Sequence, residues 1–156
     1  MQGTGQAIVH ALKYKDGLFL KFDFLTLLEK YFSSYKGFLE NSLLIPVPLY
    51  FWREYKRGYN QSAYLAHWLA KWSGSRVNAC LKRRKPTRTQ TELNKEDRKR
   101  NVKNAFSLSL KASINANEKY ILVDDVFTTG ATLNACAKVL KEAGAKWVGV
   151  FTFGHG

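Results

Sequence analysis

The stretch YILVDDVFTTGAT, residues 120–132, decides the fold of this chain of 156 residues. Its first four residues are apolar, with the length and composition of a strand that is buried on both faces. Two carboxylates, Asp124 and Asp125, follow this run, and hydroxyls and a glycine come next. From Leu133 onward, apolar residues recur at helical spacing. The stretch therefore predicts a buried strand, a short polar loop and the first turn of a helix.

The polar loop has the chemistry of a sugar-phosphate site. A helix N-terminus offers free backbone N–H groups and a dipole that favours a phosphate, and Gly130 lets the backbone approach it closely. Asp124 and Asp125 would repel a phosphate, so they suit sugar hydroxyls or a cation that accompanies the ligand. The alternative is an ordinary turn in which Thr and Gly serve only as turn and cap residues. That alternative leaves two costly buried carboxylates unexplained.

The rest of the chain alternates between strand and helix patterns. This order favours a parallel sheet with helices on both faces. The predicted strands span residues 43–47, 77–81, 106–110, 120–125 and 147–153, and the later helices span 60–73 and 132–143. Two earlier helices are predicted near residues 8–16 and from 24 to a point before Gly37. The two strands that flank residues 82–104 are candidates for a local antiparallel pair.

Charge is concentrated in two segments of the chain. The formal net charge is +13, and residues 82–103 hold ten basic and three acidic residues, a net +7. A second basic cluster comprises Arg53, Lys56 and Arg57. Such a field attracts a pyrophosphate or a nucleic-acid backbone, although a solvated basic surface remains an alternative for part of it. A loop of about 23 residues, 82–104, is also too long to be a mere connection in a compact domain.

Residues 123–132 closely resemble the signature of the type I phosphoribosyltransferases. Three further motifs, in the expected order, make the chain similar to the ComF (GntX/ComF) family: Ala11-Leu12-Lys13-Tyr14, then PVPL at 46–49 with RGYNQ at 57–61, then the Arg-rich loop ending in Ala105-Phe106. The resemblance implies an α/β fold with the parallel-sheet core of a type I phosphoribosyltransferase. Residues 41–156 would form this core, residues 1–40 an N-terminal helical hood-like segment, and residues 82–104 a long, flexible basic loop that closes over the reacting centre.

The resemblance also implies a ligand, phosphoribosyl pyrophosphate (PRPP), with Mg²⁺ bound through PRPP rather than by dedicated protein ligands. Asp124 and Asp125 would bind the ribose and act as the catalytic residues. The expected PRPP-binding residues are Asp124, Asp125, Thr128, Thr129, Gly130, Ala131, Thr132, Arg53, Lys56 and Arg57. The functional residues expected in the loop are Arg84, Thr87, Gln90, Arg98 and Asn101.

Members of this family usually carry a cysteine-rich N-terminal segment that binds zinc. This chain has no cysteine before Cys80, and His10, His67 and His155 are widely spaced, so we expect no zinc in it; the segment has been removed or is absent in nature. Cys80 and Cys136 fit buried thiols in a reducing compartment. Without a signal peptide or a long apolar run, the chain is expected to be cytoplasmic and not inserted in a membrane.

The expected nucleic-acid contacts combine aromatic and basic side chains. Bases of single-stranded DNA stack on aromatic rings while cations follow the phosphates. The expected contacts are Trp52, Tyr55, Arg83, Arg84, Lys85 and Arg88, with Phe51 and Tyr59 as core residues in the alternative reading. The resemblance implies a role in natural transformation, handling incoming single-stranded DNA, with other competence or recombination proteins as candidate partners. The alternative function is an enzyme that transfers phosphoribose to an unknown small-molecule acceptor, unrelated to DNA. No residue stands out as a general base, so turnover stays open.

Overall fold

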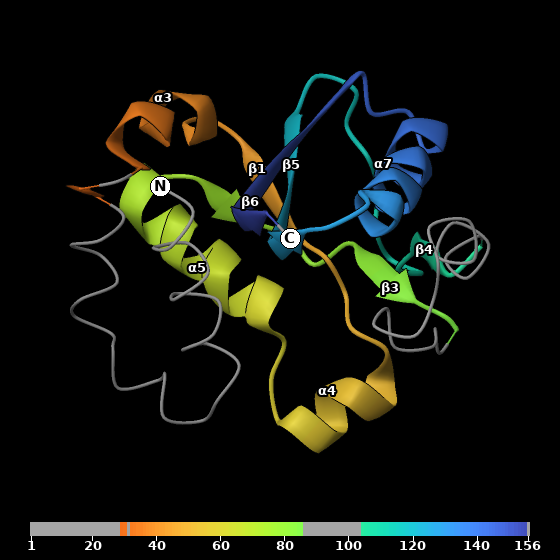
Figure 1. The fold of residues 1–156 in the computed structure, drawn as a ribbon. Coiled ribbons are helices and arrows are strands. Elements are labelled where there is room, and N and C mark those ends of the chain that lie inside the picture. The colour runs from red at the N-terminus through yellow and green to blue at the C-terminus, as the bar shows by residue number, and fades with distance from the viewer. Residues whose placement is uncertain (1–28, 31, 86–103, 156) are drawn as a thin grey trace.

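The computed structural model of the chain describes residues 29–30, 32–85 and 104–155. Its core is a four-stranded parallel sheet in the order β2-β1-β5-β6 (Figure 1). The strands are β1 (Leu43–Pro46), β2 (Arg76–Val77), β5 (Lys119–Phe127) and β6 (Trp147–His155). The parallel sheet predicted from the alternation of strand and helix patterns is confirmed.

Two helices cover opposite faces of the sheet. In β1, Leu44 packs in one buried cluster with α5 (Gln61–Ser73), while its neighbour Ile45 packs in the other with α7 (Ala131–Glu142). Ile121 and Leu122 of β5 divide in the same way. Because successive side chains of a strand point to opposite faces, this division places a helix on each face, as predicted.

The chain leaves the two central strands in opposite directions. From β1 it passes through α4 (Phe51–Arg57) and α5 to β2 on one side, and from β5 through α7 to β6 on the other. The strands β1 and β5 pair directly, and Val47 N–H donates to the Val123 carbonyl at 3.0 Å just beyond β1. The carboxyl ends of β1 and β5 are therefore a topological switch point, the place where open α/β sheets bind ligands.

The predicted strand 77–81 is two strands in the structure. Asn78 N–H still bonds to the Leu44 carbonyl at 3.0 Å, after which the chain leaves the main sheet. A new strand, β3 (Leu81–Arg83), then pairs antiparallel with β4 (Phe106–Leu108) in a separate sheet, which confirms the predicted antiparallel pair. The predicted strand 106–110 ends at residue 108, and Leu110 is 97% exposed.

The helical segment before β1 runs further than predicted. A 3₁₀ turn at Ser33–Tyr35 leads into α3 (Lys36–Leu39), which passes through Gly37 instead of ending before it. Burial explains the difference: Leu39 is fully buried, and the Phe38 ring packs against Trp147 at 5.9 Å. Such packing outweighs the roughly 1 kcal/mol that a helical glycine costs. Residues 1–28 of the predicted hood-like segment lie outside the described residues.

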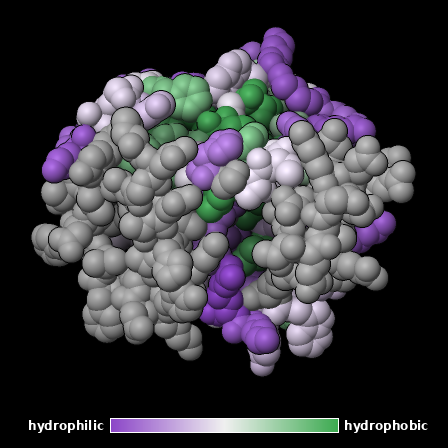
Figure 2. All heavy atoms as spheres, viewed as in Figure 1, coloured by the Kyte–Doolittle hydropathy of each residue, from purple (hydrophilic) through white to green (hydrophobic). Residues whose placement is uncertain are grey.

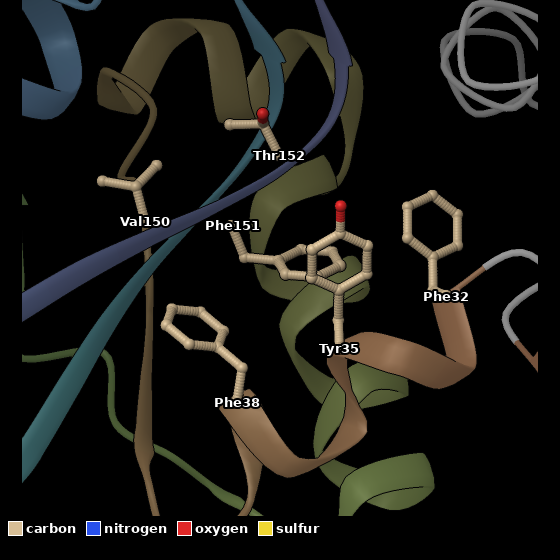
Figure 3. Close-up of a pocket in the computed structure, with 6 residues that line it drawn as sticks. All are labelled: Phe32, Tyr35, Phe38, Val150, Phe151 and Thr152. Carbon is tan, nitrogen blue, oxygen red and sulfur yellow. The ribbon is translucent and has the colours of Figure 1, made fainter. Parts of the chain in front are cut away.

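An aromatic pocket of about 310 Å³ lies between this segment and the edge strand β6 (Figure 3). It is lined by Phe32, Tyr35, Phe38, Val150, Phe151 and Thr152. Two of the lining rings, Tyr35 and Phe151, pack edge to face with their centres 6.0 Å apart. None of the site residues predicted from the sequence lines this pocket. Across the described residues, no helix is long and apolar enough to cross a membrane.

Candidate binding site at the carboxyl ends of the central strands

The two predicted carboxylates lie near the end of β5, at the switch point. Asp124 Oδ1 accepts hydrogen bonds from Ser62 Oγ at 2.9 Å and from the Asp125 backbone N–H at 3.0 Å. Asp125 Oδ1 accepts from the Val126 N–H at 2.8 Å. Both acids lie within the strand, which continues two residues further than predicted, to Phe127. The first carboxylate is therefore fixed by a helix on one face of the sheet as well as by its own strand.

The surroundings of Asp124 disfavour its charge. Burial first, and then the neighbouring charge of Asp125, raise the pKa of Asp124 to about 7. The bonds from Ser62 and the Asp125 N–H, and the more distant charge of Arg83, act to lower that pKa. Functional sites often contain a carboxyl whose pKa is raised toward neutrality by burial and by a second acid.

The predicted phosphate loop follows directly. Gly130 is the N-cap of the twelve-residue α7 and has a φ of +69°, which favours glycine. A Cβ added there would also lie 3.0 Å from the Phe127 ring. Thr129 Oγ1 accepts a long bond of 3.4 Å from the Ala131 N–H, and Thr128 is exposed. Residues 128–130 thus lead into the N-terminus of a full helix, which begins with residues 131 and 132, a few residues after the two acids. In other proteins the free N–H groups at such a helix N-terminus bind anions.

The corner between α4 and α5 forms the opposite side of the site. Gly58 ends α4 with a φ of +82°, and its N–H bonds to the Glu54 carbonyl at 2.7 Å. The Asn60 side chain accepts from the Ser62 N–H at 3.0 Å, which confirms it as the predicted N-cap of α5. Its amide nitrogen donates to the Val47 carbonyl at 3.1 Å. This one side chain therefore attaches the start of α5 to the end of β1.

The predicted residues of α4 and of the basic loop fall in three groups. Lys56 and Arg57 are exposed at the end of α4, and Arg57 donates to Gln61 Oε1. Arg53 belongs to the same helix. On β3 and just after it, the Arg83 guanidinium lies 5.3 Å from the centre of the Phe106 ring, and Arg84 Nε donates to Ser107 Oγ at 2.7 Å, whereas Lys85 is exposed. The other predicted loop residues, Thr87, Arg88, Gln90, Arg98 and Asn101, lie outside the described residues.

Helix α4 is not among the helices predicted from the sequence. Its aromatic side chains are not a buried face: Phe51, Trp52 and Tyr55 are 66%, 64% and 75% exposed. They contact one another instead, with ring centres 5.8 to 6.3 Å apart. The alternative that Phe51 is a core residue is therefore wrong, and Tyr59 is half-buried.

Figure 1 shows α4 and the β3–β4 pair beyond the same edge of the main sheet, where β1 and β5 end. In the space-filling view from this side, hydrophilic surface (purple) is seen at the lower centre, where Figure 1 places α4 (Figure 2). Aromatic and basic side chains thus share the short helix α4.

Ser62 was missing from the predictions, and Gln61 was named only as the last residue of the RGYNQ motif. Both are 3% exposed in the first turn of α5, where Ser62 bonds to Asp124 and Gln61 to Arg57. The signal in the sequence was the run of polar residues after Gly58, at positions where a helix would bury apolar ones. As for metal binding, the described residues hold no group of three or more His, Cys, Asp or Glu side chains arranged to hold an ion.

Comparison with known proteins identifies the class. Residues 81–154 match the family model of the phosphoribosyl transferase domain. The chain is 43% identical to competence protein F of Haemophilus influenzae over 109 residues, which cover 69% of this chain and 48% of that protein. It is 39% identical to the DNA utilization protein YhgH of Escherichia coli, covering 69% of this chain and 47% of the relative, and 32% identical to competence protein ComFC of Streptococcus pneumoniae, covering 85% and 58%.

The chain belongs to the ComF family within the phosphoribosyltransferase superfamily. It spans about half the length of the curated relatives it matches. Among solved structures it is similar to a purine phosphoribosyltransferase from Pyrococcus horikoshii, with a TM-score of 0.43 at 14% identity, covering 95% of this chain and 70% of that one. A hypoxanthine phosphoribosyltransferase from Staphylococcus aureus gives a TM-score of 0.45 at 12% identity, covering 96% and 63%.

Proposed function

We propose that this protein binds PRPP together with Mg²⁺ at the switch point and handles incoming single-stranded DNA during natural transformation, as a ComF-like competence protein. One observation carries the proposal: the Asp124–Asp125 pair and the loop at the N-terminus of α7 meet at the carboxyl ends of the central strands. A ComF-like competence role agrees with the names of the relatives.

The geometry supports one orientation of PRPP. Its 5′-phosphate would accept N–H groups from the loop 128–132, and its ribose hydroxyls would donate to Asp124 and Asp125. The pyrophosphate would then face the α4–α5 corner with Lys56 and Arg57. Mg²⁺ prefers oxygen ligands and keeps several waters, so the two carboxylates fit a cation held mainly by PRPP oxygens.

The DNA part of the proposal depends on the surface of α4. Phe51, Trp52 and Tyr55 offer exposed rings, and Lys56 and Arg57 offer cations on the same helix. Bases of any sequence stack on such rings, while the cations attract the phosphates. We therefore expect weak binding of single-stranded DNA with little preference for sequence.

The alternative, an enzyme that transfers phosphoribose to a small acceptor unrelated to DNA, gains support from one observation. With its pKa raised to about 7, Asp124 is suited to exchange a proton at neutral pH, and the sequence pointed to no such group. Departure of pyrophosphate would leave positive charge on the ribose, which the nearby carboxylates would stabilise. Release of pyrophosphate from PRPP in the presence of candidate acceptors, and no effect of DNA, would favour this enzyme.

Calorimetric titration with PRPP and Mg²⁺ tests the main proposal. Changing both acids, Asp124→Ala and Asp125→Ala, should weaken binding by several kcal/mol, since each charge-assisted hydrogen bond contributes about 1.5–3 kcal/mol. A matched control, Glu40→Ala with Glu142→Ala, removes the same charge at exposed positions away from these strand ends. Equal PRPP affinity in the acid-pair variant and in the control would refute the site.

A further inference from the structure

The side chain of Gln61 is buried but only half satisfied. It is 3% exposed, its Oε1 accepts a hydrogen bond from Arg57, and its Nε2 has no hydrogen-bond partner among the described residues. A buried amide donor without an acceptor costs folding free energy, so such a group in a folded protein calls for a reason. Gln61 therefore occupies its position for something other than the stability of the core.

The orientation of this amide follows from its neighbour. The Arg57 guanidinium carries only donors, so the carboxamide oxygen must face it. If the amide were rotated by half a turn, the Gln61 NH₂ group would face the Arg57 guanidinium, and two donors would meet without an acceptor. The unpaired nitrogen is thus a direct consequence of holding the arginine.

Arg57 has few other constraints. It is the last residue of α4, it is exposed, and Gly58 follows with a left-handed backbone. A long exposed side chain samples many rotamers, and the bond to Gln61 restricts them. Because a guanidinium has five N–H donors in a rigid fork, the bond to Gln61 leaves donors for oxygens of a pyrophosphate.

The first turn of α5 holds both sides of the candidate site at once. Gln61 binds the Arg57 guanidinium, and the next residue, Ser62, donates to the Asp124 carboxylate at 2.9 Å. This turn is itself attached to the end of β1 by Asn60. One helical turn therefore sets the position of the cation relative to the acid pair.

We propose that Gln61 is a positioning residue that holds the Arg57 guanidinium for the pyrophosphate group of PRPP. The proposal deepens the PRPP site of the proposed function and rests on it. If Gln61 is a positioning residue, changing it must alter ligand affinity through Arg57. The change must then affect only ligands that carry a pyrophosphate, whereas the loss of an ordinary buried side chain would not discriminate between ligands.

The test uses Gln61→Met, which keeps the length of the side chain and removes both the acceptor and the unpaired donor. The thermal stability should stay equal or rise, because a buried unsatisfied donor is removed. Affinity for Mg²⁺–PRPP and for Mg²⁺–pyrophosphate should fall about tenfold, a typical loss for one oriented hydrogen-bonding group. Affinity for ribose 5-phosphate, which lacks the pyrophosphate, should not change.

Arg57→Met at an exposed position tests the same link without altering the buried side chain. It should weaken PRPP binding at least as much as Gln61→Met, and the double variant should bind no more weakly than Arg57→Met alone. Wild-type affinity in Gln61→Met, additive losses in the double variant, or an equal loss for ribose 5-phosphate would each overturn the positioning role. If the wild-type protein binds no PRPP, the proposed function itself is wrong.

Discussion

Ser62 Oγ donates a hydrogen bond of 2.9 Å to Asp124 Oδ1, which joins the first turn of α5 to the end of β5. The bond favours the ionised form of a carboxyl whose pKa burial and Asp125 raise to about 7. The proton on Asp124 is therefore controlled by a residue that is distant in the sequence, and this control makes the site sensitive to pH.

We expect Ser62→Ala to shift the pH dependence of PRPP binding. Ribose hydroxyls need an ionised acceptor, so PRPP affinity should rise as the pH rises through the pKa of Asp124. Without the Ser62 hydroxyl that pKa should rise by about one unit, because hydrogen bonds to charged groups contribute roughly 1.5–3 kcal/mol. Calorimetry from pH 6 to pH 9 would show the midpoint move upward.

Ser73→Ala is the matched control, because Ser73 lies in the same helix and its hydroxyl donates only to a backbone carbonyl and contacts Ser75. Its pH midpoint should equal that of the wild type. A Ser62→Ala profile that coincides with the control profile would show that Ser62 does not govern Asp124.

Asp124→Asn should stabilise the ligand-free protein while it weakens PRPP binding. The folded-state pKa of Asp124 is raised from 3.8 to about 7, so between about pH 4 and pH 7 the native state holds a proton that the unfolded state has released. Stability therefore falls as the pH rises through this window, and the full penalty is present above it. Denaturant unfolding should show a gain from Asp124→Asn that is about 3 kcal/mol larger at pH 8 than at pH 5. An equal gain at both pH values would contradict the raised pKa.

Gly130→Ala should damage the phosphate loop and the fold together. The backbone at Gly130 is left-handed, which costs about 1–2 kcal/mol for a residue with a Cβ, and that Cβ would lie 3.0 Å from the Phe127 ring. We expect a loss of about 1–3 kcal/mol in unfolding free energy and weaker binding of ribose 5-phosphate. Gly37→Ala is the control, since nothing lies within 4 Å of its added Cβ and its φ is not positive. A Gly130→Ala protein as stable as this control would refute the strain.

Removing rings from α4 should weaken single-stranded DNA binding without changing its dependence on salt. Trp52→Ala with Tyr55→Ala should cost about 1–3 kcal/mol for each base that stacks. The slope of log affinity against log salt should stay constant, because the cations that neutralise the phosphates are all retained. A fluorescent oligonucleotide titrated at several salt concentrations would measure both quantities, with the exposed Leu110→Ala as control.

The complementary variant changes Arg83, Arg84, Lys85 and Arg88 to Ala. It should flatten the salt slope by roughly 0.7 for each phosphate that the variant no longer neutralises. DNA binding that is unaffected by salt, by the ring changes and by these four changes would leave the basic segment with a role toward pyrophosphate alone.

The alternation of apolar strands and amphipathic helices predicted the parallel sheet, its two covered faces and the antiparallel pair, because each pattern is local to its own element. The acid pair and the loop of residues 128–132 could also be predicted, because they lie in one continuous stretch of sequence. One prediction failed because packing overrode local preference, at the helical turn through Gly37, which the buried Leu39 stabilises. Helix α4 was missed for a different reason, since it is exposed and has no buried face whose apolar spacing would indicate a helix.

The sequence by itself thus determined the class of fold and the stretch that would bind a sugar phosphate, since those depend on neighbouring residues. Only the tertiary structure decided the opposite side of the site. The contacts of Ser62 with Asp124 and of Asn60 with Val47 join residues far apart in the chain, and sequence order carries no information about such distances. The raised pKa of Asp124 likewise arises from burial and from Asp125, and the burial exists only once the strands and helices have packed together.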